Sequence, residues 1–130
     1  MRPLGFPPAL RLHKGSEFDA VFREGSSASD GMLVIHALPN GGTEPRLGLA
    51  VGKALGGAVA RNRVKRLLRE AFRLRRRDLP AGHDLVAVPR ADPAEAWTLA
   101  ACERSLVCLA ARAAERRRKD GGRRGRRPPP

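Results

Sequence analysis

The feature that most constrains the fold of this chain is a periodic segment at residues 58–76, the longest of its kind in the sequence. Successive residues of a helix lie about 100° apart, and at this spacing six apolar side chains fall on one side of the segment. They are Val64, Leu67, Leu68, Ala71, Phe72 and Leu74. We therefore predict an amphipathic helix that packs its apolar side against a sheet and ends before Pro80.

The opposite side of this helix is basic. Arg61 and Arg63 lie near the two borders of the apolar side, and Glu70 is the one acid, spaced to pair with Arg66 or Arg73. Charged helix faces usually mix both signs and only keep a protein soluble. Crowded like charges destabilise a helix, so this face makes better sense as a binding surface for a polyanion. Its other members are Asn62, Lys65, Arg66, Arg69, Arg73, Arg76 and Arg77.

The overall charge also favours a polyanionic partner. The chain has 130 residues, enough for one domain, with 26 Lys and Arg against 13 Asp and Glu and a net charge of +13. Nucleic acid is the first candidate, because each neutralised phosphate releases counterions, and an anionic membrane surface is the rival. Arginine dominates the helix face, and its planar guanidinium can hold phosphate or stack on bases that RNA exposes, so RNA is favoured over duplex DNA.

Several classes of protein and site are disfavoured. Spanning a membrane takes about 20 consecutive apolar residues, and the apolar runs here are far shorter. The proline-rich N-terminus has no signal-peptide core, so we expect a cytoplasmic protein. Cys102 and Cys108 lie on different helix faces and are expected to be small core residues. His13 and His83 have no partners at ligand spacing, so no metal site is predicted by motif.

The remaining elements are predicted from turn and cap signals. Ser16-Glu17-Phe18-Asp19 has the spacing of a capping box for a first helix that stops near Gly25. Residues 31–39 and 46–51 are apolar runs typical of strands, and Asn40-Gly41-Gly42 between them predicts a hairpin. In the second run, small residues alternate with Leu47, Leu49 and Val51, which indicates close backbone approach on one face.

Residues 84–88 form a short apolar run that predicts a buried strand after the long helix. A strand, a helix and a strand in this order indicate a crossover between parallel strands. Asp92-Pro93-Ala94-Glu95 then opens a third helix, with Leu99, Cys102, Leu106 and Leu109 on its apolar side. The predicted fold is α+β, a two-layer α/β sandwich with the order α-β-β-(β)-α-β-α.

Three segments follow from composition. Residues 1–10 are expected to be a flexible N-terminal segment, and residues 11–115 the RNA-binding domain. Residues 116–130 form an arginine-rich tail with nothing apolar to bury, which we expect to be disordered when free and to add sequence-independent RNA affinity.

The run from Ala58 to Glu70, with Arg61-Asn62-Arg63 followed by Lys65, Arg66 and Arg69, resembles the signature of the bacterial ribonuclease P protein subunit. The resemblance extends over residues 11–109. It takes in Arg11-Leu12-His13-Lys14, Glu17-Phe18, Val21-Phe22, Leu47-Gly48-Leu49, Val51, Lys53, Asp84-Leu85-Val86 and Arg90.

The resemblance implies a fold and a role. The family places its strand-helix-strand unit in a left-handed crossover. Its RNA subunit hydrolyses precursor tRNA to release the 5′ leader, using bound Mg²⁺, while the protein assists. We therefore expect no catalytic residue in this chain, the catalytic RNA and precursor tRNA as partners, and no obligate protein partner. The scattered carboxylates agree, because a two-metal nuclease site needs several that converge.

The resemblance also implies two binding sites. Contact with the RNA subunit is carried over to Arg61, Asn62, Arg63, Lys65, Arg66 and Arg69, and Arg73 shares their face. Contact with the single-stranded leader is carried over to Phe18, Phe22, Val34, His36, Lys53 and Arg90.

Parts of this interpretation have alternatives. Without the resemblance, the spacing of Phe18 and Phe22 favours core packing over base stacking. His36 stands where the family commonly has an aromatic residue such as tyrosine. Ala54 and Gly52 replace a common basic residue and a common serine, so the leader-side charge is expected to be weaker here.

Two other functions compete with this interpretation. They are a structural ribosomal protein and a peripheral membrane protein that uses a basic amphipathic helix.

Overall fold

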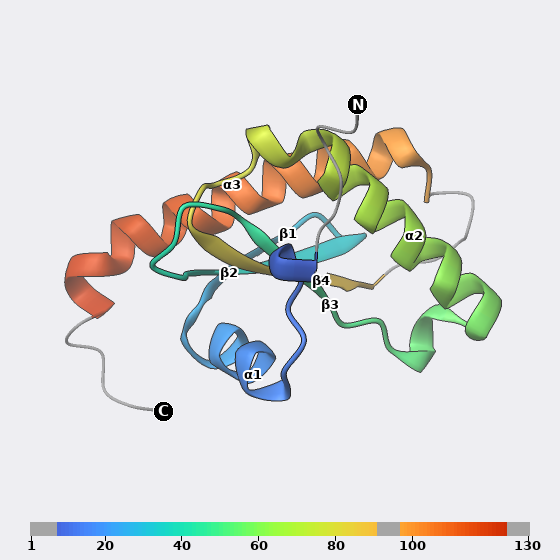
Figure 1. Cartoon of the computed structure of the whole chain (residues 1–130), viewed down its shortest axis with the longest axis horizontal. Coiled ribbons are helices and arrows are strands. Elements are labelled where there is room, and N and C mark those ends of the chain that lie inside the picture. Colours follow the sequence, from blue (N-terminus) through green and yellow to red (C-terminus); the bar gives the residue numbers. More distant parts are fainter. Residues whose placement is uncertain (1–7, 91–96, 125–130) are drawn as a thin grey trace.

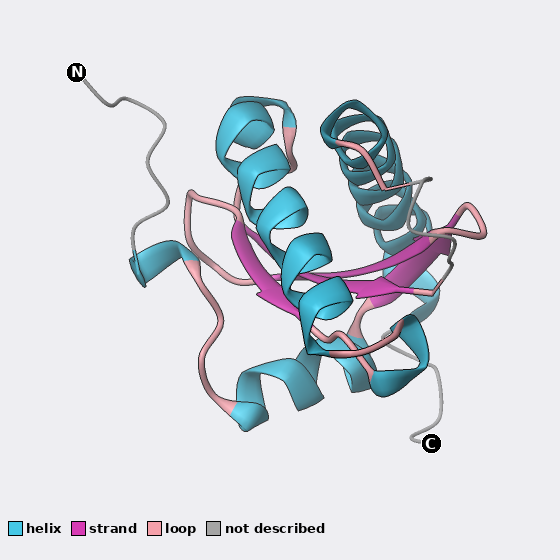
Figure 2. Cartoon of the chain, turned by 90° about the vertical axis from the view of Figure 1, so that its right-hand side faces the viewer, coloured by secondary structure: helices cyan, strands magenta, loops and turns pink. Residues whose placement is uncertain are grey.

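The computed structural model describes the backbone of residues 8–90 and 97–124 and the side chains of residues 9–90 and 97–116. Four strands form one mixed sheet, in the order β1-β2-β4-β3, with β3 parallel to β4 and the other pairs antiparallel. The helices lie on both of its faces, α2 and α3 on one and α1 on the other (Figures 1 and 2). The bounds of the elements are α1 Gly15–Glu24, β1 Ser26–Ser29, β2 Leu33–Pro39, β3 Arg46–Leu49, α2 Ala58–Arg75, β4 His83–Pro89 and α3 Leu99–Arg124.

This architecture confirms the predicted α+β class and element order, with β1 as the optional strand. The sheet under α2 and α3 is the expected two-layer unit, and α1 adds partial cover to the opposite face. The parallel pair β3 and β4 is joined through α2, as the crossover pattern predicted. The left hand of that crossover stays a prediction.

The alternation of side chains along the strands divides the molecule into two apolar clusters. On the face under α2 and α3, Leu33 and Ile35 of β2 pack in one cluster with Leu68 and Phe72 of α2. Trp97, only 1% exposed, belongs to the same cluster. The α1 face has a much smaller buried cluster, made of Leu12, Val21 and Val86. The large cluster therefore accounts for most of the apolar burial.

The predicted hairpin between β2 and β3 is wrong. β4 lies between them, because its residues from Asp84 to Ala87 are all buried and such a strand takes a central place. The hairpin partner of β2 is β1, which the sequence analysis did not locate. Its turn contains Asp30 and Gly31, and Asp30 Oδ1 accepts hydrogen bonds from the backbone N–H groups of Met32 and Leu33.

The first helix starts two residues earlier than predicted, with Lys14 rather than Ser16 as the N-cap, so the Ser16–Asp19 capping box is wrong. Glu17 Oε1 instead accepts hydrogen bonds from the backbone N–H groups of His13 and Lys14, at 3.0 and 3.1 Å. One carboxylate thus satisfies two donors before the first turn. The predicted end near Gly25 is confirmed.

The third helix differs from the prediction at its C-terminal end, whereas its predicted start is not described. Its described part begins at Leu99, where Thr98 Oγ1 accepts a hydrogen bond from the Ala101 N–H, and the predicted cap at residues 92–95 lies outside the described residues. The helix continues to Arg124, so it includes residues that composition assigned to the tail. Residues 125–130 and most of the predicted flexible segment 1–10 are not described, although Pro8–Leu10 forms a short 3-10 turn, η1.

The two cysteines have different environments. Cys102 is fully buried in the core, as predicted, and burial raises the pKa of its thiol to about 11. Cys108 is exposed, so its assignment to the core is wrong. The two residues are both unpaired thiols.

Candidate RNA-binding surfaces

The outer side of α2 is basic, as the periodicity predicted. Val64, Leu68 and Phe72 are buried against the sheet and α3, which leaves no apolar side of this helix for lipid. Asn62, Arg63, Arg66 and Arg69 are exposed, whereas Arg61, Lys65 and Arg73 are half-buried. The predicted RNA-subunit set therefore lies along one helix.

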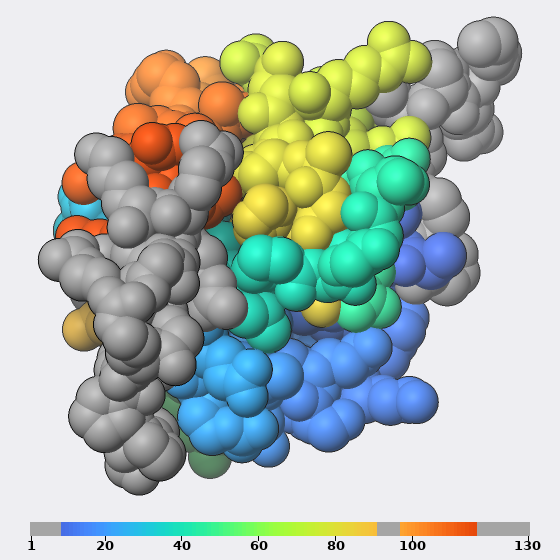
Figure 3. Space-filling model, turned by 90° about the vertical axis from the view of Figure 1, so that its left-hand side faces the viewer, coloured from blue at the N-terminus to red at the C-terminus, as the bar shows by residue number. Residues whose placement is uncertain are grey.

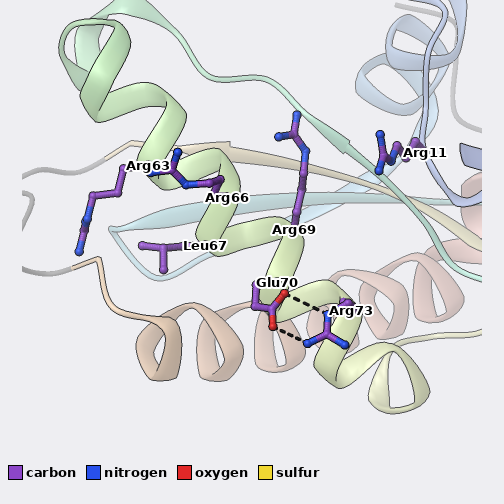
Figure 4. A pocket seen from close by; sticks show the side chains of 7 residues that line it. All are labelled: Arg11, Arg63, Arg66, Leu67, Arg69, Glu70 and Arg73. Carbon is purple, nitrogen blue, oxygen red and sulfur yellow. Dashed lines mark hydrogen bonds and ion pairs between the residues drawn. The ribbon is translucent and has the colours of Figure 1, made fainter. Parts of the chain in front are cut away.

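An open hollow of about 570 Å³ runs beside this helix. Within the described part of the chain, Arg66 and Arg69 form no ion pair, and in Figure 4 both side chains extend away from the joined pair of Glu70 and Arg73. The hollow is lined by Arg11, Arg63, Arg66, Leu67, Arg69, Glu70 and Arg73. Because Arg66 and Arg69 form no ion pair within the described part of the chain, the hollow is suited to an anion.

Glu70 pairs with Arg73 rather than with Arg66. Arg73 Nε donates to Glu70 Oε1 at 3.0 Å, and Nη2 donates to the second oxygen. These hydrogen bonds lower the pKa of Glu70 below its usual value and raise that of Arg73. Glu70, the single acid of this face, is thus bound to Arg73, and Arg66 remains available to bind an anion.

Arg61 occupies a different position from the exposed arginines. Its side chain is partly covered, and its buried Nε atom has no hydrogen-bond partner among the described residues. A buried donor without a partner is costly, and a bound phosphate or carbonyl oxygen would satisfy it.

The predicted leader residues lie on the other face of the sheet. Val34 and His36 alternate with the buried residues of β2 and so point toward the α1 side. Phe22, 43% exposed, packs its ring edge-to-face on His36, with centroids 4.9 Å apart. Phe18 is half-buried beside Gly48 of β3. The two phenylalanines therefore contact the sheet and remain partly exposed. This arrangement is compatible both with packing on the sheet and with stacking on bases.

The two cations of the leader set flank this strip of sheet at one end. Lys53 lies in η2 (Lys53–Leu55) shortly after β3, and Arg90 directly follows β4. Because β3 and β4 are parallel and adjacent, both cations lie beyond the same end of the sheet, where these two strands finish. Val34 is paired with Val88 near that end. The structure thus places two exposed cations beyond one end of the sheet, whose α1 face carries the partly exposed aromatic rings.

A second hollow connects the two surfaces. It has a volume of about 220 Å³ and lies at the outer edge of β3, the edge strand. Lys65 and Arg69 of α2 line it together with Phe18 and Gly48. Arg11 and His13 line it as well, and the sequence analysis did not assign them to a site. The signal that places them is the pairing of Arg11 with Leu47, which only the folded sheet shows.

The comparisons with known proteins agree with this geometry. The sequence model of the family described as Ribonuclease P matches residues 6–114. The ribonuclease P protein component of Brevibacillus brevis is 45% identical over 104 residues, covering 79% of this chain and 82% of that protein. The chain belongs to the ribonuclease P protein family. It is therefore the protein component of a ribonucleoprotein endoribonuclease that acts with an RNA subunit in tRNA 5′ processing.

Solved structures of the ribonuclease P family share the fold. The RNase P protein from Thermotoga maritima is 32% identical with a TM-score of 0.71, covering 78% of this chain and 96% of that chain. The Staphylococcus aureus protein is 29% identical with a TM-score of 0.68, covering 82% and 95%. Membership of this family decides against the ribosomal alternative. None of the helices in the described residues is long and apolar enough to cross a membrane.

Proposed function

We propose that the ribonuclease P protein uses two connected surfaces for two RNAs. The basic face of α2 binds the RNA subunit near its catalytic core, and the strip between α1 and the ends of β3 and β4 binds the single-stranded 5′ leader of precursor tRNA. The observation that carries this proposal is the hollow at the edge of β3, where Lys65 and Arg69 meet Phe18. One RNA path can therefore pass from the helix face to the aromatic strip.

The chemistry of each surface suits its proposed partner. On α2, the exposed Arg66 and Arg69 provide phosphate contacts, which position a structured RNA without reading its sequence. On the α1 side, Phe18 and Phe22 offer rings for stacking, while Lys53 and Arg90 offer charge. Stacking with charge tolerates any base, as a variable leader requires.

We also propose that Mg²⁺ is bound mainly by the RNA subunit. Among the described residues, no three His, Cys, Asp or Glu side chains gather as a metal site would require. The contribution of this chain is then to bind and orient RNA. A cytoplasmic location fits this role, because precursor tRNA is made there in bacteria.

The first test is cleavage by the reconstituted enzyme. Adding the protein to its cognate RNA subunit at low Mg²⁺ should promote removal of the 5′ leader, because bound cations offset repulsion between the two RNAs. Absence of stimulation at every salt concentration would refute the proposal.

The leader surface is tested separately with Lys53→Ala in the holoenzyme. Affinity for precursor tRNA should fall, whereas affinity for mature tRNA, which has no leader, should not change. Arg104→Ala removes the same charge from an exposed position on α3 and should affect neither. An equal loss with mature tRNA would remove Lys53 from the leader site.

A further inference from the structure

A buried carboxylate holds one arginine at the start of the parallel strand pair. Arg46 and Asp84 are directly paired in the β3–β4 register. Arg46 Nε donates to Asp84 Oδ1 at 2.7 Å and Nη2 to Oδ2 at 2.8 Å, while Asn40 Nδ2 donates to Oδ1 at 2.9 Å. The Asp84 side chain is only 10% exposed. Two parallel hydrogen bonds of this kind fix the plane of the guanidinium.

The fixed guanidinium has one further nitrogen, which reaches α1. Arg46 Nη1 donates to Glu17 Oε2 at 3.3 Å, and the other oxygen of Glu17 accepts the two backbone N–H groups that begin α1. Both oxygens of Glu17 are therefore engaged, one by its own helix and one by the sheet. The hydrogen bonds from His13 and Lys14, with the charge of Arg46, hold the pKa of Glu17 below its usual value.

The other attachments of α1 are few. The helix has ten residues, too short to be stable alone in water, and Val21 is its only buried side chain. Figure 3 shows the side of the molecule on which α1, in blue, lies beside the 40–45 loop, in turquoise. Because so little apolar surface fixes the helix, a polar tether at its first turn has a large share in setting its position.

The position of α1 decides where the leader surface lies. Phe18 follows Glu17 directly and rests on Gly48, two residues after Arg46 on the same strand. Phe22, one turn later, contacts His36 of β2. The helix thus crosses the sheet from β3 to β2, and the tether stands at the β3 end. A tilt at that end would move both rings.

We propose that Arg46 and Glu17 are positioning residues for the precursor-tRNA leader: Asp84 fixes Arg46, and Arg46 fixes α1 through Glu17 so that Phe18 and Phe22 face the leader. Neither residue has to touch RNA for this role. The inference rests on the proposed leader surface and adds the device that holds it in place.

The test is Glu17→Gln in the holoenzyme, with Asp19→Asn as the matched control. Both substitutions remove one negative charge from α1, and Asp19 is exposed. A general charge effect would tighten RNA binding equally in both. The proposal requires the opposite for Glu17→Gln alone: about three- to fivefold weaker binding of precursor tRNA, with unchanged affinity for mature tRNA and for the RNA subunit. Equal behaviour of the two variants would overturn it.

A double-mutant cycle shows whether Glu17 acts through the ring. If it does, Glu17→Gln should cost much less in a Phe18→Ala background than in the wild-type protein. Additive losses would mean an independent role and would refute the proposal. If Phe18→Ala leaves the binding of precursor tRNA intact, the proposed leader surface is wrong. If Phe18→Ala weakens this binding but Glu17→Gln does not, the leader surface stands and only the positioning role of Glu17 is wrong.

A structural readout that does not depend on cleavage completes the test. In the free protein, burial holds the pKa of His36 below its usual 6.5, and Phe22 contributes to that burial. Displacement of α1 in Glu17→Gln should raise the His36 pKa in NMR titrations, and Asp19→Asn should not change it. Arg46→Lys is the second variant, since lysine cannot hold both carboxylates through a fixed fork, and should give the same selective loss. Retention of full leader affinity in Arg46→Lys would also overturn the proposal.

Discussion

The ring of Phe18 lies against the backbone of Gly48, so closely that a Cβ atom at Gly48 would be 2.7 Å from Phe18 Cζ. The same atom would lie 3.0 Å from Leu12 Cδ1. Small residues on one face of this strand predicted a close approach, and the structure identifies the approaching group as an aromatic ring of α1. This contact joins the leader surface to the edge strand beside α2.

Gly48→Ala should therefore push the Phe18 ring or all of α1 away from β3. We expect a loss of about 1–3 kcal/mol in the free energy of unfolding, as for overpacking elsewhere, measured by urea denaturation. Gly52→Ala is the control, because a Cβ atom there meets nothing within 4 Å and the backbone has φ −88°. Equal stability of the two variants would show that the ring moves without cost.

Arg66→Ala should weaken binding of the RNA subunit and change its salt dependence. One lost phosphate contact lowers the slope of log K against log salt by about 0.9, because one fewer set of counterions is released. The measurement is a filter-binding titration at several salt concentrations, with exposed Arg104→Ala on α3 as the control. An unchanged slope would remove Arg66 from the interface.

Glu70→Gln should have the opposite effect on the same measurement. It breaks the ion pair between Glu70 and Arg73 and removes the negative charge of Glu70 from the hollow beside α2. Affinity for the RNA subunit should rise about two- to threefold at low ionic strength and less at high salt. Asp19→Asn makes the same charge change on α1, so an equal gain in that variant would assign the effect to net charge alone.

Local patterns in the sequence were sufficient for α2. Its basic and apolar sides depend only on helical periodicity, so Arg66 and Phe72 could be placed on their faces without tertiary information. The strand β1 was missed because Ser26-Ser27-Ala28-Ser29 shows no apolar alternation, although the following Asp30-Gly31 is a hairpin signal. The strand order was wrong because nothing local shows that β4 enters between β2 and β3.

The same distinction applies to the binding surfaces. The motif at Arg61 identified the helix face, but the tether of α1 joins Arg46 to Glu17 and to Asp84, 29 and 38 residues apart in the sequence. Spacing carries no information about such contacts. Arg11 reaches the hollow at β3 only because its segment pairs with Leu47. Residues that position a site are thus harder to predict than residues in its motif.

Glu17 should make the stability of the protein depend on pH. Its pKa is lowered from 4.5 in the folded state by the His13 and Lys14 N–H groups and by Arg46, so its ionised form stabilises the fold. That stabilisation is complete above the unfolded-state pKa and is lost as the pH falls through the lower folded-state pKa. Glu17→Gln should therefore be less stable than wild type at about pH 6, and the difference should shrink toward about pH 3.

Urea denaturation at a series of pH values measures this difference directly. Asp19→Asn removes a carboxylate from the same helix without breaking a hydrogen bond of the described residues. Its stability should therefore fall as the pH is lowered, as in wild type, whereas Glu17→Gln should lack the part of that fall that comes from Glu17. The tether also predicts that Arg46→Lys weakens this pH dependence only in part, because the two backbone donors to Glu17 remain. A constant difference between wild type and Glu17→Gln across the series would show that the Glu17 charge does not stabilise the start of α1.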